Sequence, residues 1–171
     1  MKDPILSNKK FAYLFIKTEI IELPDPARSE MIQIIYHMLA DNGFSICRTY
    51  ERPITYDQAR ELYPRRKLKH PDWGGLEEYL KRISSGDSRI LILKYKNDDA
   101  QVALKKLVGA DPEKAEPNTI RGELREPMQR EYENLETRNG IHAPETAVEA
   151  EEELAILLYK NEIDDITTIL K

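Results

Sequence analysis

A short apolar run that ends in a lysine constrains this chain more than any other segment. Residues 11–16 read Phe-Ala-Tyr-Leu-Phe-Ile, and Lys17 follows directly. A continuous apolar stretch of this length, rich in aromatic residues, indicates a buried strand. The strand would then present a positive charge at its end, so Lys17 is the first residue to consider for contact with an anionic substrate.

Hydrophobic periodicity predicts two further strands and a series of helices along the chain. The strands are expected over residues 44–50 and 88–95, and the helices over residues 28–42, 55–63, 76–83, 100–108 and 147–158. Thr55 is the predicted N-cap of the short helix up to residue 63, and Asp98 or Asp99 that of the helix over 100–108. Residues 161–171 are expected to form a docked helical tail.

The stretch from residue 110 to residue 143 shows little periodicity. Two turn signals, Asp111-Pro112 and Pro117-Asn118, interrupt it, and residues 125–137 are almost wholly polar. We interpret the part between residues 123 and 137 as a long, charged surface loop. A loop of this length inside a compact domain is usually functional, or else it indicates a wrong assignment.

Length and composition favour one ordinary globular domain that spans residues 1–171. With 26 basic and 31 acidic residues, the net charge of -5 argues against a general nucleic-acid binder. No apolar run approaches the roughly 20 residues that a membrane span requires, and no signal peptide is recognised, so we expect a cytoplasmic protein. Cys47 is the only cysteine, which excludes an internal disulfide and a cysteine-based zinc cage.

The motifs of the common nucleotide-binding folds are absent from the sequence. It contains neither G-x-G-x-x-G nor G-x-x-x-x-G-K-[ST], and none of its three histidines lies in H-E-x-x-H. His37 is interpreted as a solvated helix residue and His70 as part of an exposed basic loop. His142 differs because Asn139 and Glu153 accompany it.

A histidine can act as a nucleophile when a carboxylate fixes its second ring nitrogen. Glu153 is the candidate for that role beside His142. Phosphoryl transfer needs, beyond a positioned nucleophile, mainly cations on the phosphate oxygens. Lys17, Arg121 and a magnesium ion could supply those charges.

Four segments together resemble the nucleoside diphosphate kinases. Residues 13–17 look like the strand that ends in the family's phosphate-binding lysine, and residues 107–112 followed by 117–122 look like its leucine-glycine, proline and threonine-isoleucine-arginine-glycine run. Residues 138–143, Arg-Asn-Gly-Ile-His-Ala, look like its active-histidine segment, and residues 150–154 match the helix with its supporting glutamate.

The resemblance implies an α+β fold, a ferredoxin-like antiparallel sheet with helices on one face, and homo-oligomers, commonly hexamers or tetramers. It implies ping-pong transfer of the terminal phosphate of ATP to nucleoside diphosphates through a phosphohistidine. Magnesium would be held mainly by the nucleotide phosphates, with no metal ligands from the protein. The implied roles are nucleophile for His142, orientation of His142 for Glu153, support of the site for Tyr63, and phosphate or ribose contact for Lys17, Arg121 and Asn139.

Several positions depart from the family pattern. Thr18-Glu19 replaces the usual proline and aspartate, and Pro144 replaces a serine. Lys105 stands where the family has an arginine. A phosphate contact there would keep its positive charge but lose the planar guanidinium that binds phosphate through two hydrogen bonds. The aromatic residue that stacks on the base would align near Asp72, with Trp73 as its neighbour.

These departures keep a second hypothesis open. The chain could be a degenerate family member that binds nucleotides or proteins and transfers little phosphate. The joint presence of His142, Arg121, Asn139 and Glu153 favours the active kinase, because a binding module has no need of the nucleophile. The sequence leaves the base preference, the state of assembly and the role of residues 123–137 open.

Overall fold

The protein is built around a four-stranded antiparallel sheet. The computed structural model describes residues 9–63, 75–110, 114–133, 135 and 138–170. Its strands are β1 (Phe11–Ile16), β2 (Phe44–Pro53), β3 (Asp87–Tyr95) and β4 (Ile141–His142), in the spatial order β2-β3-β1-β4. The three strands expected from the sequence are confirmed, and β4 is a short addition. β1 is central, which explains why all six of its residues are buried.

Eight helices are present in the described part of the chain. They are α1 (Thr18–Ile21), α2 (Ala27–Asp41), α3 (Tyr56–Leu62), α4 (Leu76–Ile83), α5 (Ala100–Val108), α6 (Ile120–Glu131), α7 (Ala147–Leu157) and α8 (Lys160–Ile169). The five helices predicted from periodicity and the helical tail are confirmed. None of the helices in the described residues is long and apolar enough to cross a membrane.

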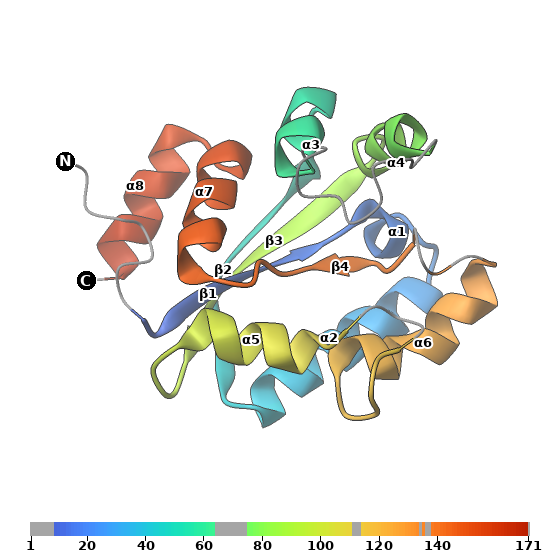
Figure 1. Cartoon of the computed structure of the whole chain (residues 1–171), viewed down its shortest axis with the longest axis horizontal. Helices are drawn as coiled ribbons and strands as arrows, with labels where there is room; N and C mark the ends of the chain where they lie inside the picture. The colour runs from blue at the N-terminus through green and yellow to red at the C-terminus, as the bar shows by residue number, and fades with distance from the viewer. Residues whose placement is uncertain (1–8, 64–74, 111–113, 134, 136–137, 171) are drawn as a thin grey trace.

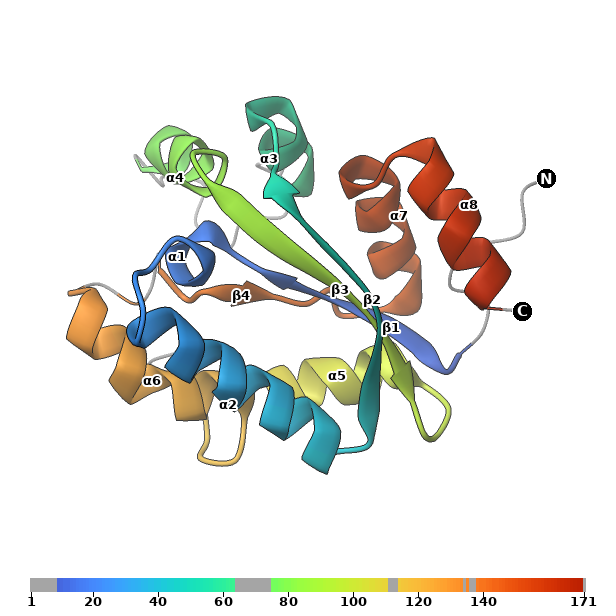
Figure 2. The ribbon, with the colours of Figure 1, turned by 180° about the vertical axis from the view of Figure 1, so that it is seen from behind.

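The helices cover both faces of the sheet, so the expectation of helices on one face is wrong. Figure 1 shows α2, α5 and α6 below the sheet and α3, α4, α7 and α8 above it, and Figure 2 shows the same layers from behind. Along β1, Ala12, Leu14 and Ile16 belong to one core cluster, whereas Phe11, Tyr13 and Phe15 belong to the other. A strand covered on both faces needs apolar residues at every position, which is the pattern of residues 11–16.

The helix α6 occupies much of the stretch that we interpreted as a charged loop. Its buried side chains include Ile120, Leu124 and Met128, which are spaced four residues apart and pack into the core. Most of the intervening residues are charged, and Pro127 lies inside the helix, so the apolar face is narrow and easy to miss. The prediction of a surface loop over residues 123–137 is therefore wrong for residues 123–131.

The predicted caps have different outcomes. Thr55 caps α3 in a capping box with Gln58, as the sequence suggests. Asp99 precedes α5, but it adopts a left-handed backbone with φ 60° and its side chain makes no capping hydrogen bond. Asn118 also has a left-handed backbone, with φ 66°, a conformation that asparagine tolerates better than most residues.

Candidate active site

The histidine lies on the short strand β4, directly beside the centre of the sheet. β4 pairs with the last two residues of β1, with His142 opposite Phe15 and Ile141 opposite Ile16. The backbone N–H of Lys17 donates to the carbonyl of Gly140 at 2.8 Å, which extends this contact by one residue. Pairing of β1 with β4 therefore brings Lys17 next to the strand that carries His142.

His142 forms a dyad with Glu153 of α7. The ring atom Nε2 lies 2.7 Å from the carboxylate Oε2, and the side chains of His142 and Glu153 are 20% and 2% exposed. A carboxylate accepts hydrogen bonds, so Nε2 carries the proton and Nδ1 keeps a lone pair. Among the described residues none makes a hydrogen bond with Nδ1, so this nitrogen is available as a nucleophile.

The same carboxylate accepts a hydrogen bond from a residue that the sequence did not single out. Tyr13 of β1 donates its hydroxyl to Oε2 of Glu153, and its side chain is fully buried. Burial raises the pKa of Tyr13 well above its usual value, and the charge of Glu153 raises it further. Its ring fits the apolar pattern of β1, but a buried tyrosine hydroxyl normally needs a partner, and that is the only signal the sequence offered.

Lys17 and Asn139 meet in the site. Lys17 is 1% exposed. Its Nζ atom donates to Oδ1 of Asn139 at 2.6 Å and to the hydroxyl of Tyr79 at 2.8 Å. These partners hold a buried cation in place close to β4. Two residues predicted from distant motifs are thus in direct contact. Tyr79 is a further site residue, which the sequence places only within the helix predicted over residues 76–83.

Tyr63 forms an aromatic wall beside the histidine. Its ring centroid lies 5.5 Å from that of His142 and 5.2 Å from that of Tyr79, in edge-to-face arrangements. Burial raises the pKa of Tyr63 well above its usual value, and the neighbouring Tyr79 raises it further. Trp73, predicted at the base, lies outside the described residues.

Arg121 reaches the site from the first turn of α6. Its guanidinium donates to the carbonyl oxygens of Gly109, Ala110 and Ile141 at 3.2, 3.3 and 3.3 Å. It therefore joins the end of α5 to the residue before His142. Gly122 is needed at this turn, because a Cβ there would lie 2.1 Å from the carbonyl oxygen of Glu116.

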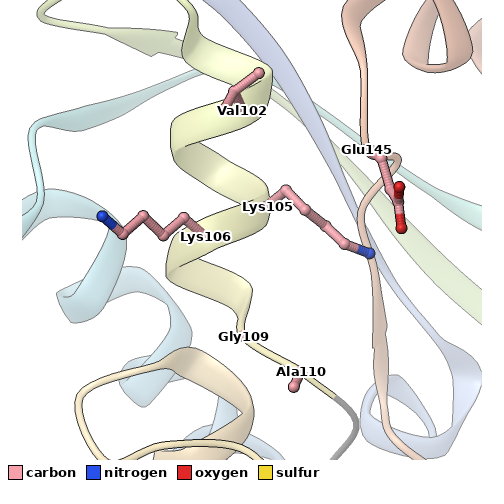
Figure 3. A pocket seen from close by; sticks show the side chains of 6 residues that line it. All are labelled: Val102, Lys105, Lys106, Gly109, Ala110 and Glu145. Atoms are coloured by element: carbon pink, nitrogen blue, oxygen red, sulfur yellow. The ribbon is translucent and has the colours of Figure 1, made fainter.

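Lys105 lies on α5 next to an open cavity of about 470 Å³. Its Nζ donates to the carbonyl of Ala143 at 3.1 Å, one residue beyond His142. Figure 3 shows Lys105 extending from α5 toward the segment that leads to Glu145, while Lys106 extends to the other side of the helix. Lys105 thus sits at the flank of the site, with its ammonium group tied to the backbone that carries the histidine.

The side chains brought together here are mostly cations and hydrogen-bond donors. Lys17, Arg121 and Lys105 approach the segment 139–143 from three different elements, and the dyad glutamate is the carboxylate at its centre. No cluster of three or more histidine, cysteine, aspartate or glutamate side chains suited to a metal occurs among the described residues. Such a site suits an anionic, phosphate-bearing substrate better than a metal ion bound by the protein alone.

The fold and the site together define an α+β protein in which a sheet edge presents a histidine, held by a buried glutamate, among cationic side chains. The sequence profile of the family described as nucleoside diphosphate kinase matches residues 17–163. The chain therefore belongs to the nucleoside diphosphate kinase family, a family of enzymes that transfer phosphate between nucleotides.

Individual relatives support this assignment. The chain is 29% identical to the nucleoside diphosphate kinase of Sulfolobus acidocaldarius over 154 residues, which cover 90% of this chain and 93% of the relative. It is 27% identical to that of Metallosphaera sedula over 150 residues, which cover 87% of this chain and 97% of the relative.

Solved structures confirm the ferredoxin-like fold. The nucleoside diphosphate kinase of Halobacterium salinarum, solved in complex with CDP, superposes with a TM-score of 0.67 at 22% identity and covers 91% of each chain. The enzyme from Pyrobaculum aerophilum gives a TM-score of 0.65 at 20% identity, with 90% of this chain and 98% of the other covered.

Proposed function

We propose that the chain transfers the terminal phosphate of ATP to nucleoside diphosphates through a phosphohistidine at His142. The observation that carries this proposal is the dyad itself, in which Glu153 binds Nε2 and leaves Nδ1 of His142 available. A buried carboxylate on one ring nitrogen makes the other nitrogen a better nucleophile and stabilises the positive charge that forms on the ring.

In the first half-reaction, the lone pair of Nδ1 attacks the γ-phosphorus of ATP. The bond between that phosphorus and the β–γ bridging oxygen breaks, and ADP leaves with the electron pair. In the second half-reaction, a terminal oxygen of the acceptor diphosphate attacks the same phosphorus, and the electron pair of the P–N bond returns to Nδ1. Glu153 keeps its hydrogen bond to Nε2 throughout, so the ring does not change orientation between the two steps.

The cations act on the phosphate oxygens. Lys17, Arg121 and Lys105 would neutralise charge on the transferred and neighbouring phosphates, and Asn139 would donate its amide N–H to phosphate or ribose while its oxygen binds Lys17. Tyr63 would fix the ring of His142 from the side. Trp73 is proposed to contact the base.

The family uses a divalent metal ion, and we propose that magnesium fills this role here. The described site offers ammonium, guanidinium and amide groups, so the ion would be held mainly by the nucleotide phosphates. When bound, it supplies neutralisation of charge on the β- and γ-phosphate oxygens.

We also propose a homo-oligomer, a hexamer or a tetramer, that acts in the cytoplasm. The resemblance of the sequence to the family supports the assembly, and so does the position of β2 at one edge of the sheet. Ile46, on β2, is 39% exposed. A sheet edge with an exposed apolar side chain is open to pairing with another copy. Analytical ultracentrifugation tests this part directly.

The decisive experiment follows the phosphate. The protein is incubated with γ-labelled ATP and magnesium and then chased with GDP. We expect an acid-labile, alkali-stable adduct on His142 that disappears as labelled GTP forms, and no transfer by His142→Ala. Nucleotide binding without any adduct would instead favour the degenerate, binding-only family member.

A further inference from the structure

We propose that Tyr13 is a positioning residue for phosphate transfer, whose hydroxyl holds the Glu153 carboxylate in place against His142. This proposal rests on the proposed function, because it assigns Tyr13 a part in the reaction of His142. Tyr13 touches neither the substrate nor the reacting nitrogen, so it acts through Glu153.

The first observation is that one oxygen accepts both hydrogen bonds. Oε2 of Glu153 accepts from the hydroxyl of Tyr13 and from Nε2 of His142. The Tyr13 and Glu153 side chains are 0% and 2% exposed, so water does not compete for the carboxylate. Three elements, β1, β4 and α7, therefore meet at this single atom, and the orientation of the carboxylate depends on both donors.

The second observation is that the side chain of Gln101 holds the backbone of Tyr13 by a hydrogen bond. β4 pairs only with Phe15 and Ile16, so the N–H of Tyr13 lies beyond the paired part of this edge of β1. Gln101 of α5 accepts from this N–H through Oε1 at 3.0 Å and donates through Nε2 to the carbonyl of Pro144 at 3.0 Å. One buried amide thus ties the strand of Tyr13 to the segment that follows His142.

The third observation concerns charge. When phosphate is transferred to Nδ1, the imidazole ring gains positive charge, and an ionised Glu153 stabilises it. A donor to a buried carboxylate stabilises its charged form. Among the described residues, the other titratable groups near this pair include Tyr63 beside the ring, Tyr79 and Lys17 next to Tyr63, and Glu149 one turn before Glu153 on α7.

Among these neighbours, Tyr13 is the one whose hydroxyl donates to the carboxylate. Burial raises the pKa of Tyr13 well above its usual value, so the hydroxyl keeps its proton and remains a donor at neutral pH. The hydroxyl can therefore serve the dyad throughout the catalytic cycle.

The test uses Tyr13→Phe, which removes the hydroxyl and keeps the ring. We expect the rate of His142 phosphorylation by magnesium-ATP to fall about tenfold, the effect of one hydrogen bond to a charged group. A matched control is Tyr36→Phe, which removes a half-buried hydroxyl that binds Arg89 at 2.9 Å, away from the site. It should leave the rate of His142 phosphorylation unchanged.

Two further measurements separate positioning from folding and from the proposed function itself. On a Glu153→Gln background, adding Tyr13→Phe should cost much less than in the wild type, because Tyr13 acts through the carboxylate. Without nucleotide, the NMR signal of the His142 Nε2–H proton should exchange with water faster in Tyr13→Phe. This signal tests the contact even if the wild type is never phosphorylated.

The proposal fails if Tyr13→Phe retains the wild-type phosphorylation rate and the wild-type Nε2–H exchange. It also fails if Tyr13→Phe costs as much with Gln at position 153 as with Glu, since the tyrosine would then act on stability alone. A wild-type protein that never phosphorylates His142 overturns the proposed function, whatever the exchange measurement shows.

Discussion

The ammonium group of Lys17 lies 2.6 Å from the amide oxygen of Asn139, although 122 residues separate them in the chain. Lys17 directly follows β1, a central strand of the sheet, and Asn139 precedes the strand that carries His142. This contact orders the two sides of the site before any nucleotide binds. It also fixes the orientation of the Asn139 amide, and its N–H groups would donate to a phosphate or ribose in the proposed reaction.

Replacing Lys17 tests the role of this cation. We expect Lys17→Ala to lower turnover by about a hundredfold, because one charged donor to the developing phosphate charge is lost. Lys106→Ala is the matched control, since Lys106 is exposed on α5 and points away from Lys105 in Figure 3. Steady-state kinetics with ATP and GDP measure both variants. Equal turnover in Lys17→Ala and wild type would remove Lys17 from the mechanism.

Arg121 should affect both stability and activity. Its guanidinium binds three backbone carbonyls and is 8% exposed, so we expect Arg121→Ala to lower the free energy of unfolding by about 3 kcal/mol. Turnover should fall further than stability explains, by about a hundredfold at a temperature where the variant is folded. Urea unfolding and kinetics on the same preparation check this. An unchanged unfolding midpoint would show that the carbonyl contacts contribute nothing.

Lys105→Arg restores the planar guanidinium that the family has at this position. If the ammonium group only weakens phosphate recognition, nucleotide affinity or turnover should rise severalfold, because a guanidinium binds phosphate through two parallel hydrogen bonds. Thermal stability should change little. Calorimetric titration with ADP and steady-state kinetics measure the effect. A variant of equal stability without any gain would mean that the site is arranged around the contact of Lys105 with Ala143.

The ion pair between Arg52 and Glu162 should stabilise the packing of α8 against the sheet. Arg52 of β2 binds both carboxylate oxygens of Glu162 and also the carbonyl of Leu157 at 2.8 Å. We expect Arg52→Ala to lower the free energy of unfolding by about 2 kcal/mol. Arg48→Ala is the matched control. The side chains of Arg48 and Asp165, which form an ion pair, are 42% and 47% exposed, so this pair should contribute less than about 1 kcal/mol to the free energy of unfolding. Chemical denaturation compares the two, and equal losses would contradict the prediction.

This pair also predicts a pH dependence. Burial by itself would raise the pKa of Glu162, but the hydrogen bonds from Arg52 and from the backbone of Tyr159 lower it below its usual value. A carboxyl group whose pKa is lowered by folding stabilises the folded state at any pH above its pKa in the unfolded chain. This contribution disappears as the pH falls through its pKa in the folded state. Unfolding measured from neutral to acidic pH should therefore lose less stability in Glu162→Gln than in wild type. Parallel losses would contradict this prediction.

Local patterns in the sequence were sufficient for part of the secondary structure around the site, but not for β4 and α6. The run at residues 11–16, the periodicity of residues 147–158 and the Thr55 cap correspond to β1, α7 and α3. The motif around His142 pointed to Glu153, and the two side chains do form the dyad. The local signal failed for α6, where charged residues and Pro127 hide a narrow apolar face.

The sequence by itself determined which residues carry charge and nucleophilicity, because those are properties of single side chains and of their neighbours along the chain. Only the tertiary structure decided which of them meet. Tyr13 reads locally as one more aromatic core residue, and its contact with Glu153 joins positions 140 residues apart. The packing of helices on both faces of the sheet likewise depends on which elements come together in the fold. Such contacts are set by the packing of distant elements, which short-range periodicity does not record.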